Sequence, residues 1–222
     1  MDILAVVWYD PVVRHVWESG EKQMEEQSNE RVLANRVFEN RRFIDETFVE
    51  YEVSDCLFQD CVWESCTLTK CVLTGCRFVG CTIVSPQFEH SRVRQLEFDG
   101  CNLVGVRWHE AVTPGRAARP LRQVRGSLLK YNLFLDLPLV RFRFDGNAFP
   151  HTTFDGCDLR ESGFVGCDLR QTQFFRSDLR RADFRSAEGY EIDLFTNKLA
   201  QARFSFPEAI RLLGSLDIRL DE

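Results

Sequence analysis

An apolar residue recurs at every fifth position over most of the chain. One series runs from Leu33 to Trp108 and a second from Leu129 to Phe204, shifted by one residue and broken only at Gly189. Together they are apolar at 31 of 32 positions, whereas a 44% hydrophobic content would give about 14 by chance. A period of five fits neither an amphipathic helix nor a flat strand, so the chain must turn at a constant interval.

A second inward position lies two residues before each apolar anchor and carries small side chains. In the first series it is mostly cysteine, from Cys56 to Cys101, and in the second it is Thr, Cys, Ser or Ala, from Thr152 to Ala182. Residues two apart in an extended segment point to the same side, so charged residues between them, such as Asp158, face outward. The repeating unit is therefore small, outward, large and then a two-residue corner.

The quintets near residue 170 resemble a known repeat. Cys157–Glu161, Cys167–Gln171, Ser177–Arg181 and Ala182–Ser186 are similar to the A(D/N)LXX motif of the pentapeptide-repeat family, and the likeness covers about 170 of the 222 residues. The resemblance implies an all-β fold, a right-handed quadrilateral β-helix with four quintets per coil. The two series then predict about eight coils and a rod roughly 40 Å long, because stacked strands lie about 4.8 Å apart. Such a solenoid needs capped ends.

The two series divide the chain into five parts. Residues 1–32 form an N-terminal extension without quintets, which we expect to be partly disordered, with Met24 as an alternative start of the protein. Residues 33–108 and 129–204 form the two β-helix segments. Residues 109–128 are an insertion between the segments, and residues 205–222 form a C-terminal cap.

The insertion has the composition of a loop. It holds two prolines, two glycines and four arginines, and the five-residue period fails over its whole length. One interpretation is a solvated corner insertion. The other is a loop that contacts a partner, because a rigid rod offers few other places for specific contacts. The partner-binding candidates are Arg116, Arg119, Arg122 and Arg125.

The last 18 residues predict a helix and a strand. Ser205 and Glu208 form a capping box that begins a helix over about 206–213. Its apolar face could close the last coil, and the residues that follow alternate as in a half-buried strand. An exposed strand at a solenoid end favours pairing with a twofold copy, so we predict a homodimer, with an intramolecular cap as the alternative. The dimer or cap residues are Phe206, Ile210, Leu213, Leu216, Ile218 and Leu220.

We expect a cytoplasmic protein with reduced cysteines. The longest apolar run, Ile3–Tyr9, is too short to span a membrane, and Asp2 lies where a signal peptide carries positive charge. The nine cysteines contain no Cys-x-x-Cys motif, although Cys56 with Cys76 and Cys61 with Cys81 would lie one coil apart and near disulfide reach. We expect reduced thiols that act as compact core residues.

No motif for catalysis or cofactor binding is present in the sequence. His15, His90, His109 and His151 are scattered, and neither a Gly-rich phosphate loop nor a Gly-x-Ser-x-Gly motif occurs. Carboxylates lie at outward positions of a solid rod, where no cleft would perturb their pKa values. We therefore expect no enzymatic activity, no metal site and no cofactor.

Acidic residues gather in the first segment. No basic residue occurs between Phe43 and Thr69, and the formal net charge of −6 disfavours direct binding of nucleic acid. One interpretation is an anionic face that competes with DNA for a basic groove, and the other is a solvated surface that keeps rods apart. The candidate acidic surface consists of Asp45, Glu50, Glu52, Asp55, Asp60 and Glu64.

Parts of the C-terminal half are similar to one group within the family. Tyr190–Leu199, Ala202–Ala209 and Leu212–Leu220, with Cys101–Trp108 before the insertion, resemble the albicidin-resistance and quinolone-resistance members. The resemblance implies an end-to-end homodimer that mimics duplex DNA, binds DNA gyrase or topoisomerase IV, and protects it from a poison. The alternative is a generic protein-interaction or structural solenoid with an unknown partner.

Overall fold

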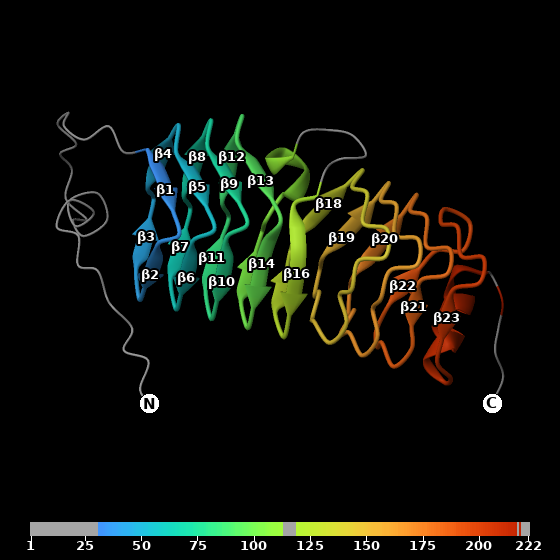
Figure 1. Cartoon of the computed structure of the whole chain (residues 1–222). Helices are drawn as coiled ribbons and strands as arrows, with labels where there is room; N and C mark the ends of the chain where they lie inside the picture. Colours follow the sequence, from blue (N-terminus) through green and yellow to red (C-terminus); the bar gives the residue numbers. More distant parts are fainter. Residues whose placement is uncertain (1–30, 113–118, 217, 219–222) are drawn as a thin grey trace, which may run out of the picture. The chain divides into compact units, whose positions relative to one another are not determined.

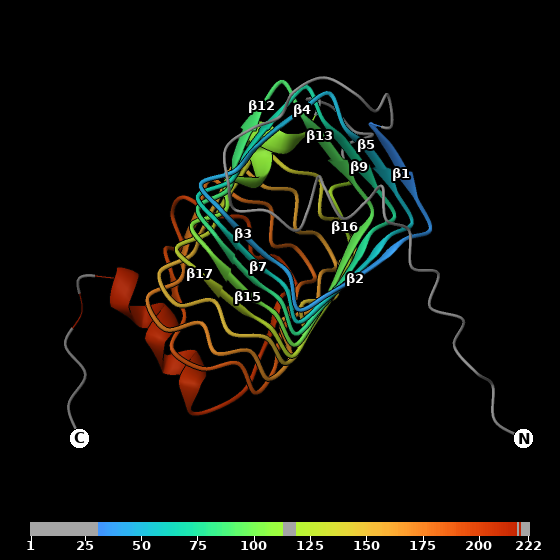
Figure 2. The ribbon, with the colours of Figure 1, turned by 90° about the vertical axis from the view of Figure 1, so that its left-hand side faces the viewer.

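The computed structural model describes residues 31–112, 119–216 and 218, and these form a β-solenoid of about eight turns. Viewed along its axis, the solenoid is a four-sided tube (Figure 2). Each turn adds one short segment to each of four walls, and the strands in every wall are parallel. The predicted all-β quadrilateral fold with about eight coils is therefore confirmed.

We name the four walls of the tube faces A to D in chain order. Figure 1 shows the strands of each face stacked along the rod. Face A begins with β1 (Val32–Ala34), β5 (Glu52–Ser54), β9 (Val72–Thr74) and β13 (Arg92–Arg94). Face B begins with β2 (Val37–Glu39), β6 (Leu57–Gln59), β10 (Arg77–Val79), β14 (Leu96–Asp99) and β16 (Leu121–Arg125). Face C begins with β3 (Arg42–Ile44), β7 (Val62–Glu64), β11 (Thr82–Val84), β15 (Asn102–Val104) and β17 (Leu128–Lys130).

Face D begins with β4 (Thr47–Val49), β8 (Thr67–Thr69) and β12 (Gln87–Glu89). After the 3-10 helix η1 (Trp108–Ala111) it continues with β18 (Leu133–Leu135), β19 (Thr153–Asp155), β20 (Gln173–Phe175) and β22 (Glu191–Ile192). In the second segment the other walls are held mainly by single bridges, such as Asp158 with Asp178 on face A and Asp168 with Glu188 on face C. Face B ends with β21 (Asp183–Phe184) and β23 (Arg203–Phe204).

Each quintet turns the chain at one residue with a left-handed backbone. Asp45, Glu50, Asp55 and Asp60 occupy four successive corners and have φ values between 51° and 60°. At Gly75 a second feature favours glycine besides the positive φ, because an added Cβ would clash with the Asp55 carboxylate of the preceding coil. A side chain at that corner would therefore displace the stacked aspartate.

The anchors form continuous columns inside the tube. On face B, Phe144, Phe164, Phe184 and Phe204 stack with ring centroids 5.2, 4.9 and 5.1 Å apart and nearly parallel planes. Rings of adjacent walls meet edge to face, as Phe164 does with Phe174 at 5.7 Å. These are the offset and T-shaped arrangements that aromatic quadrupoles favour, and they fill the interior with carbon.

The small inward residues also carry hydrogen bonds between coils. The Cys81 thiol donates to the Phe58 carbonyl oxygen at 3.3 Å, and its sulfur accepts from the Cys61 amide at 3.4 Å. Ser91 makes the same two bonds, to Leu68 oxygen at 2.7 Å and from the Cys71 amide at 2.8 Å. Our interpretation of these cysteines as compact core residues was incomplete, because they also satisfy backbone groups at the corners.

All nine cysteines are free and buried. Burial raises the pKa of the Cys157 and Cys167 thiols to about 12, so these two remain protonated at neutral pH.

The loop predicted over 109–128 is wrong for its second half. Leu121–Arg125 forms β16, in which Val124 pairs with Phe98. The coil here contains 26 residues between stacked partners instead of 20, as the bond from the Cys101 amide to Ser127 Oγ shows. Only six extra residues therefore enter the coil, and Val124, five residues before Leu129, is an anchor in phase with the second series.

Near the end of the second series, the buried anchors no longer fall at every fifth residue. Gly189 has a φ of 74°, and Tyr190 is the buried residue that follows it, with its ring 5.4 Å from that of Phe204. On face D, Ile192 pairs with Phe174, so Ile192 rather than Leu194 is the buried anchor. Burial raises the pKa of Tyr190 to about 12.

The C-terminal cap differs from the prediction in how it begins. The helix is a 3-10 helix, η2 (Glu208–Ser215), and no side chain caps it. Ser205 Oγ instead accepts a hydrogen bond from the Ser186 amide at 3.1 Å, and Glu208 Oε1 accepts one from the Gly189 amide at 2.7 Å. Inside the solenoid, corner amides donate to the next coil, as Gly166 does to Arg185 oxygen. The two side chains thus replace the missing next coil.

The stacked core predicts a large stability difference between two neighbouring phenylalanines of β20. Phe174→Ala removes a buried ring that stacks 5.1 Å from Phe154, and should lower the free energy of unfolding by about 3–5 kcal/mol. Phe175→Ala removes a ring that is 41% exposed, and should cost about 1 kcal/mol or less. Urea unfolding followed by circular dichroism measures both, and equal losses would contradict the stacked-column description.

The hydrogen-bonded role of the small positions predicts that serine can replace cysteine. Cys81→Ser keeps a donor and an acceptor and should change the free energy of unfolding by about 1 kcal/mol or less. Cys81→Ala leaves the buried Cys61 amide and Phe58 oxygen without this partner, and should cost about 1–3 kcal/mol. If alanine were tolerated as well as serine in urea titrations, the positions would matter only for volume.

Candidate interaction surfaces

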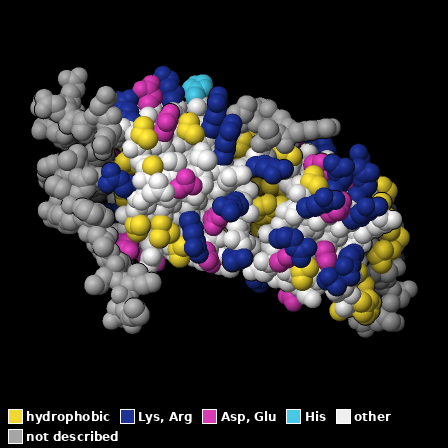
Figure 3. Space-filling view, viewed as in Figure 1, with side chains coloured by type: hydrophobic (Ala, Val, Ile, Leu, Met, Phe, Trp, Pro, Cys, Tyr) yellow, Lys and Arg dark blue, Asp and Glu magenta, His cyan; other side chains and the backbone are white. Residues whose placement is uncertain are grey.

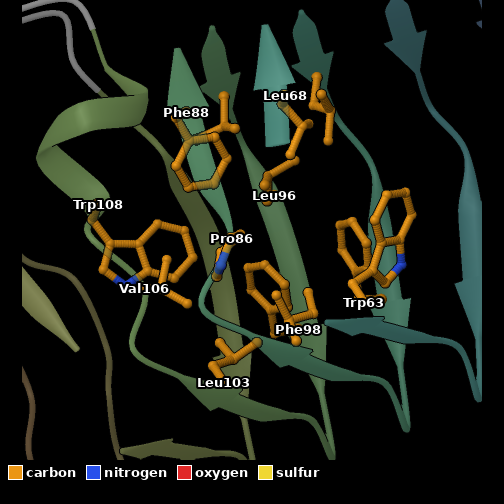
Figure 4. A pocket seen from close by; sticks show the side chains of 13 residues that line it. Trp63, Leu68, Pro86, Phe88, Leu96, Phe98, Leu103, Val106 and Trp108 are labelled. Atoms are coloured by element: carbon orange, nitrogen blue, oxygen red, sulfur yellow. The ribbon is translucent and has the colours of Figure 1, made fainter. Parts of the chain in front are cut away.

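Within the described residues, the interior of the solenoid contains a small apolar cavity. It has a volume of about 50 Å³ and is lined only by apolar side chains, including Trp63, Phe88, Phe98, Leu103 and Trp108 (Figure 4). Apolar cavities of this kind stay dry, and none of the lining residues can act as a general acid, a general base or a metal ligand. Function must therefore be sought on the outer surface.

The described residues contain neither a candidate metal site nor a membrane-spanning helix. No group of three or more His, Cys, Asp or Glu side chains in residues 31–112 and 119–216 is arranged to hold a metal ion. Within the same ranges no helix could cross a bilayer, since η1 has four residues and η2 has eight.

The structure separates the candidate acidic residues. Asp45, Glu50, Asp55 and Asp60 occupy four successive corners, so their side chains leave the tube in four directions. Glu52 lies on face A in β5 and Glu64 on face C in β7. Glu50 also pairs with Arg31 at 2.6 Å and Lys70 at 3.4 Å. The six residues therefore form no single anionic face, because consecutive quintets lie on different walls.

The candidate arginines of the insertion are only partly on a loop. Arg122 and Arg125 lie exposed on strand β16, and Arg122 pairs with Glu97 of β14 at 3.2 Å. Arg119 is exposed next to this strand, and its carbonyl oxygen accepts from the Gln95 amide at 2.9 Å. Arg116 lies outside the described residues. Arg122 and Arg125 are thus fixed on the rigid wall rather than on a loop.

The predicted cap residues do not close the last coil. Phe206 is 82% exposed and Ile210 is 44% exposed, so their side chains face solvent, while Leu213 and Leu216 are half-buried. Ile218 is exposed, and its amide donates to Leu216 oxygen at 2.9 Å, while most of the predicted strand, Leu220 included, lies outside the described residues. With Phe195, these side chains leave apolar surface at the C-terminal end of the rod.

The second segment has a charge asymmetry that a count along the sequence does not show. Its faces A and B carry eight basic and five acidic residues, a net charge of +3, over 138–146, 158–166, 178–186 and 198–205. Its faces C and D carry two basic and five acidic residues, a net charge of −3, over 147–157, 167–177 and 187–197. The segment is neutral in sum but has one basic and one acidic side. Residues 20 apart share a wall, so summing the charges separately for each wall would have revealed this asymmetry.

Most arginines of this segment are held by a nearby carboxylate. In the Asp-Leu-Arg quintets the arginine bonds the aspartate two residues earlier through Nε and Nη2, as Arg160 does to Asp158 at 2.7 Å and 2.7 Å. Arg180 repeats this with Asp178. The Arg180 guanidinium lowers the pKa of the Asp178 carboxyl through this hydrogen bond. These pairs fix both the position and the orientation of the guanidinium groups.

Two family profiles match parts of the chain. Residues 144–188 match the profile described as pentapeptide repeats (8 copies), and residues 19–108 match that of the SV2A/B/C luminal domain. A search of curated proteins returns no match for the sequence.

A solved structure shares the fold. Full-length QnrB1, a plasmid-mediated fluoroquinolone resistance protein, is 19% identical, with 84% of this chain and 97% of that chain covered and a TM-score of 0.54. HetL, a pentapeptide repeat protein involved in heterocyst differentiation regulation in Nostoc sp. strain PCC 7120, is 15% identical, with 86% and 90% covered and a TM-score of 0.47. The quintets, the four-walled solenoid and the repeat profile matched over residues 144–188 together show that the chain has the pentapeptide-repeat fold.

Proposed function

We propose that the protein is a non-enzymatic binding protein that binds a type II topoisomerase, DNA gyrase or topoisomerase IV, and protects it from a topoisomerase poison. The proposal rests on the similarity of the whole rod to one solved structure. The four-walled rod corresponds to nearly the whole length of QnrB1, a fluoroquinolone resistance protein, and not just to a stretch of repeats. Protection would occur in the cytoplasm and would confer drug resistance or self-immunity.

The anionic side of the second segment is the surface we propose for the topoisomerase. Faces C and D carry Glu188 and Glu191 at exposed positions of the last coil, whereas Asp155 and Asp168, in earlier coils, are each paired with an arginine. A rod with a line of negative charge presents to a basic groove a field similar to that of a duplex. This side replaces the acidic surface first predicted around Asp45 to Glu64, whose members point in several directions.

We also propose that the protein forms a homodimer through its C-terminal end. β22 and β23 are the last strands of their sheets among the described residues. Exposed apolar side chains gather beside them, including Phe195, Phe206 and Ile210. A second copy related by a twofold axis would cover this surface and extend the rod end to end.

The alternative function is a generic protein-interaction solenoid with a different partner. One observation favours it: the negative side chains are interrupted by paired arginines. Arg170 bonds Asp168 and Arg176 bonds Asp155 on the same anionic side, and each pair is electrically neutral. Such pairs reduce the similarity to a continuous phosphate backbone.

Removing charge from the anionic side should weaken protection of gyrase. In a DNA cleavage assay with purified gyrase and a fluoroquinolone, the unmodified protein should reduce the amount of cleaved complex. Glu188→Gln with Glu191→Gln should raise the concentration needed for half-maximal protection about tenfold, because two charges facing the basic groove are lost.

The matched control is Glu52→Gln with Glu64→Gln, which removes the same charge from exposed strand positions of the first segment. It should leave protection within about twofold of the unmodified protein. If the unmodified protein protects neither gyrase nor topoisomerase IV from any poison tested, the generic alternative is favoured.

The dimer proposal predicts that polar substitutions at the C-terminal end produce monomers. Phe206→Ser with Ile210→Ser should shift the mass measured by light scattering from a dimer to a monomer, because the apolar area that drives association is lost. Val140→Ser, at another partly exposed apolar position, is the control and should remain dimeric. A monomeric unmodified protein would contradict the proposal.

A further inference from the structure

One side of the second segment carries a net positive charge. Figure 3 shows lysine and arginine side chains gathered over the second half of the molecule, on the side formed by faces A and B. We call this surface the arginine face, and define it as faces A and B of residues 138–205, which carry the net charge of +3 described above. Arg119, Arg122 and Arg125 of the neighbouring coil extend it toward the middle of the rod.

The guanidinium groups of this face are oriented, not merely exposed. Arg160, Arg180 and Arg185 each bond an aspartate through Nε and Nη2. A guanidinium has five N–H donors, and within the described part of the chain no hydrogen bond of these three arginines uses Nη1. The outer edge of each group therefore remains available to a ligand, and its orientation is fixed before the ligand arrives.

Two of the arginines on face A lie one above the other along the rod. Arg160 and Arg180 follow Asp158 and Asp178, which pair between adjacent coils, so they lie one coil apart on face A. Stacked strands are about 4.8 Å apart. At the corner between faces A and B, Arg141 bonds Glu161 of the next coil at 2.9 Å, and Arg181, two coils beyond Arg141, bonds the neutral Gln201 at 2.8 Å.

We propose that the arginine face binds the sugar-phosphate backbone of a nucleic acid duplex, without sequence preference. Arginine presents parallel N–H donors that match two phosphate oxygens, and two such groups in adjacent coils can contact neighbouring phosphates of one strand. The partner we assign is a duplex rather than a single strand, because single-strand sites stack bases on exposed aromatic rings. On faces A and B of residues 138–205, the one exposed large apolar side chain is Val140.

The same observation removes the hydrophobic part of membrane binding, so an anionic membrane would be held by charge alone. The formal net charge of −6 led us to expect no direct binding of nucleic acid. That sum averages over opposite sides of the rod, whereas a duplex contacts only one side and responds to its local potential.

The test measures binding of a short fluorescein-labelled DNA duplex by anisotropy, with no topoisomerase present, over a series of salt concentrations. We expect saturable binding at low ionic strength that weakens steeply with salt. Arg160→Gln with Arg180→Gln should reduce the affinity at least about tenfold and lower the slope of log K against log salt by about 2, one unit for each lost phosphate contact.

The matched control is Arg170→Gln with Arg176→Gln, two arginines that are equally paired to aspartates but lie on faces C and D. It should bind the duplex like the unmodified protein. Arg181→Glu is a second test variant whose partner is neutral, so no carboxylate loses its pair, and it should also weaken binding. Circular dichroism checks that every variant is folded.

Three results would overturn the proposal: no binding of the duplex at low salt, equal losses in the control and the test variants, or binding only to anionic vesicles or to an acidic polypeptide. None depends on the proposed topoisomerase function. A protein that protects gyrase without binding the duplex would refute only this inference, and a protein that binds the duplex without protecting gyrase would refute only the proposed function.

Discussion

The 20-residue register between coils is the constraint on which the rest of this structure depends. Because Phe58 lies directly beside Phe78 and Phe98 follows in the same column, each inward side chain must fit the residues 20 positions away on either side. The phenylalanine stacks and the thiol and hydroxyl hydrogen bonds at the corners repeat with this one translation, which also brings Arg160 and Arg180 together on the surface. A change in length is tolerated only where it leaves the columns aligned, as in the 26-residue coil that brings Val124 onto Phe98.

The sequence predicts the repeated part of the fold well, because the same pattern of inward and outward positions recurs in every quintet. The inward positions of Phe154, Phe164 and Phe174 follow from the period alone, and all three are buried. Where the chain departs from the period, the prediction fails. β16 was missed because the prolines, glycines and arginines of 109–128 indicated a loop, although Val124 lies five residues before Leu129 and is in phase with the second series. Ser205 and Glu208 have the spacing of a helix cap, but the unpaired amides of Ser186 and Gly189 compete for the same oxygens and bind them.

The surfaces were harder to predict than the core, for a geometric reason. Asp45 and Asp55 are near neighbours in the sequence, yet they occupy different corners of the tube. Residues that share a wall are 20 apart, so Arg160 and Arg180 act together although many residues separate them. The position of each of these residues could be derived from the sequence, but the pattern of charge appears only when the residues are sorted by wall. The two sides of the second segment therefore offer different partners different electrostatic potentials.

The small void between Trp63 and Trp108 makes one region of the rod different from the rest. Elsewhere aromatic rings fill the tube, whereas here about 50 Å³ contains no atoms. Unfolding eliminates such empty space and so reduces the total volume of protein and water. Hydrostatic pressure therefore acts most strongly on the coils around β11 and β15, which makes this stretch the compressible part of an otherwise tightly filled rod.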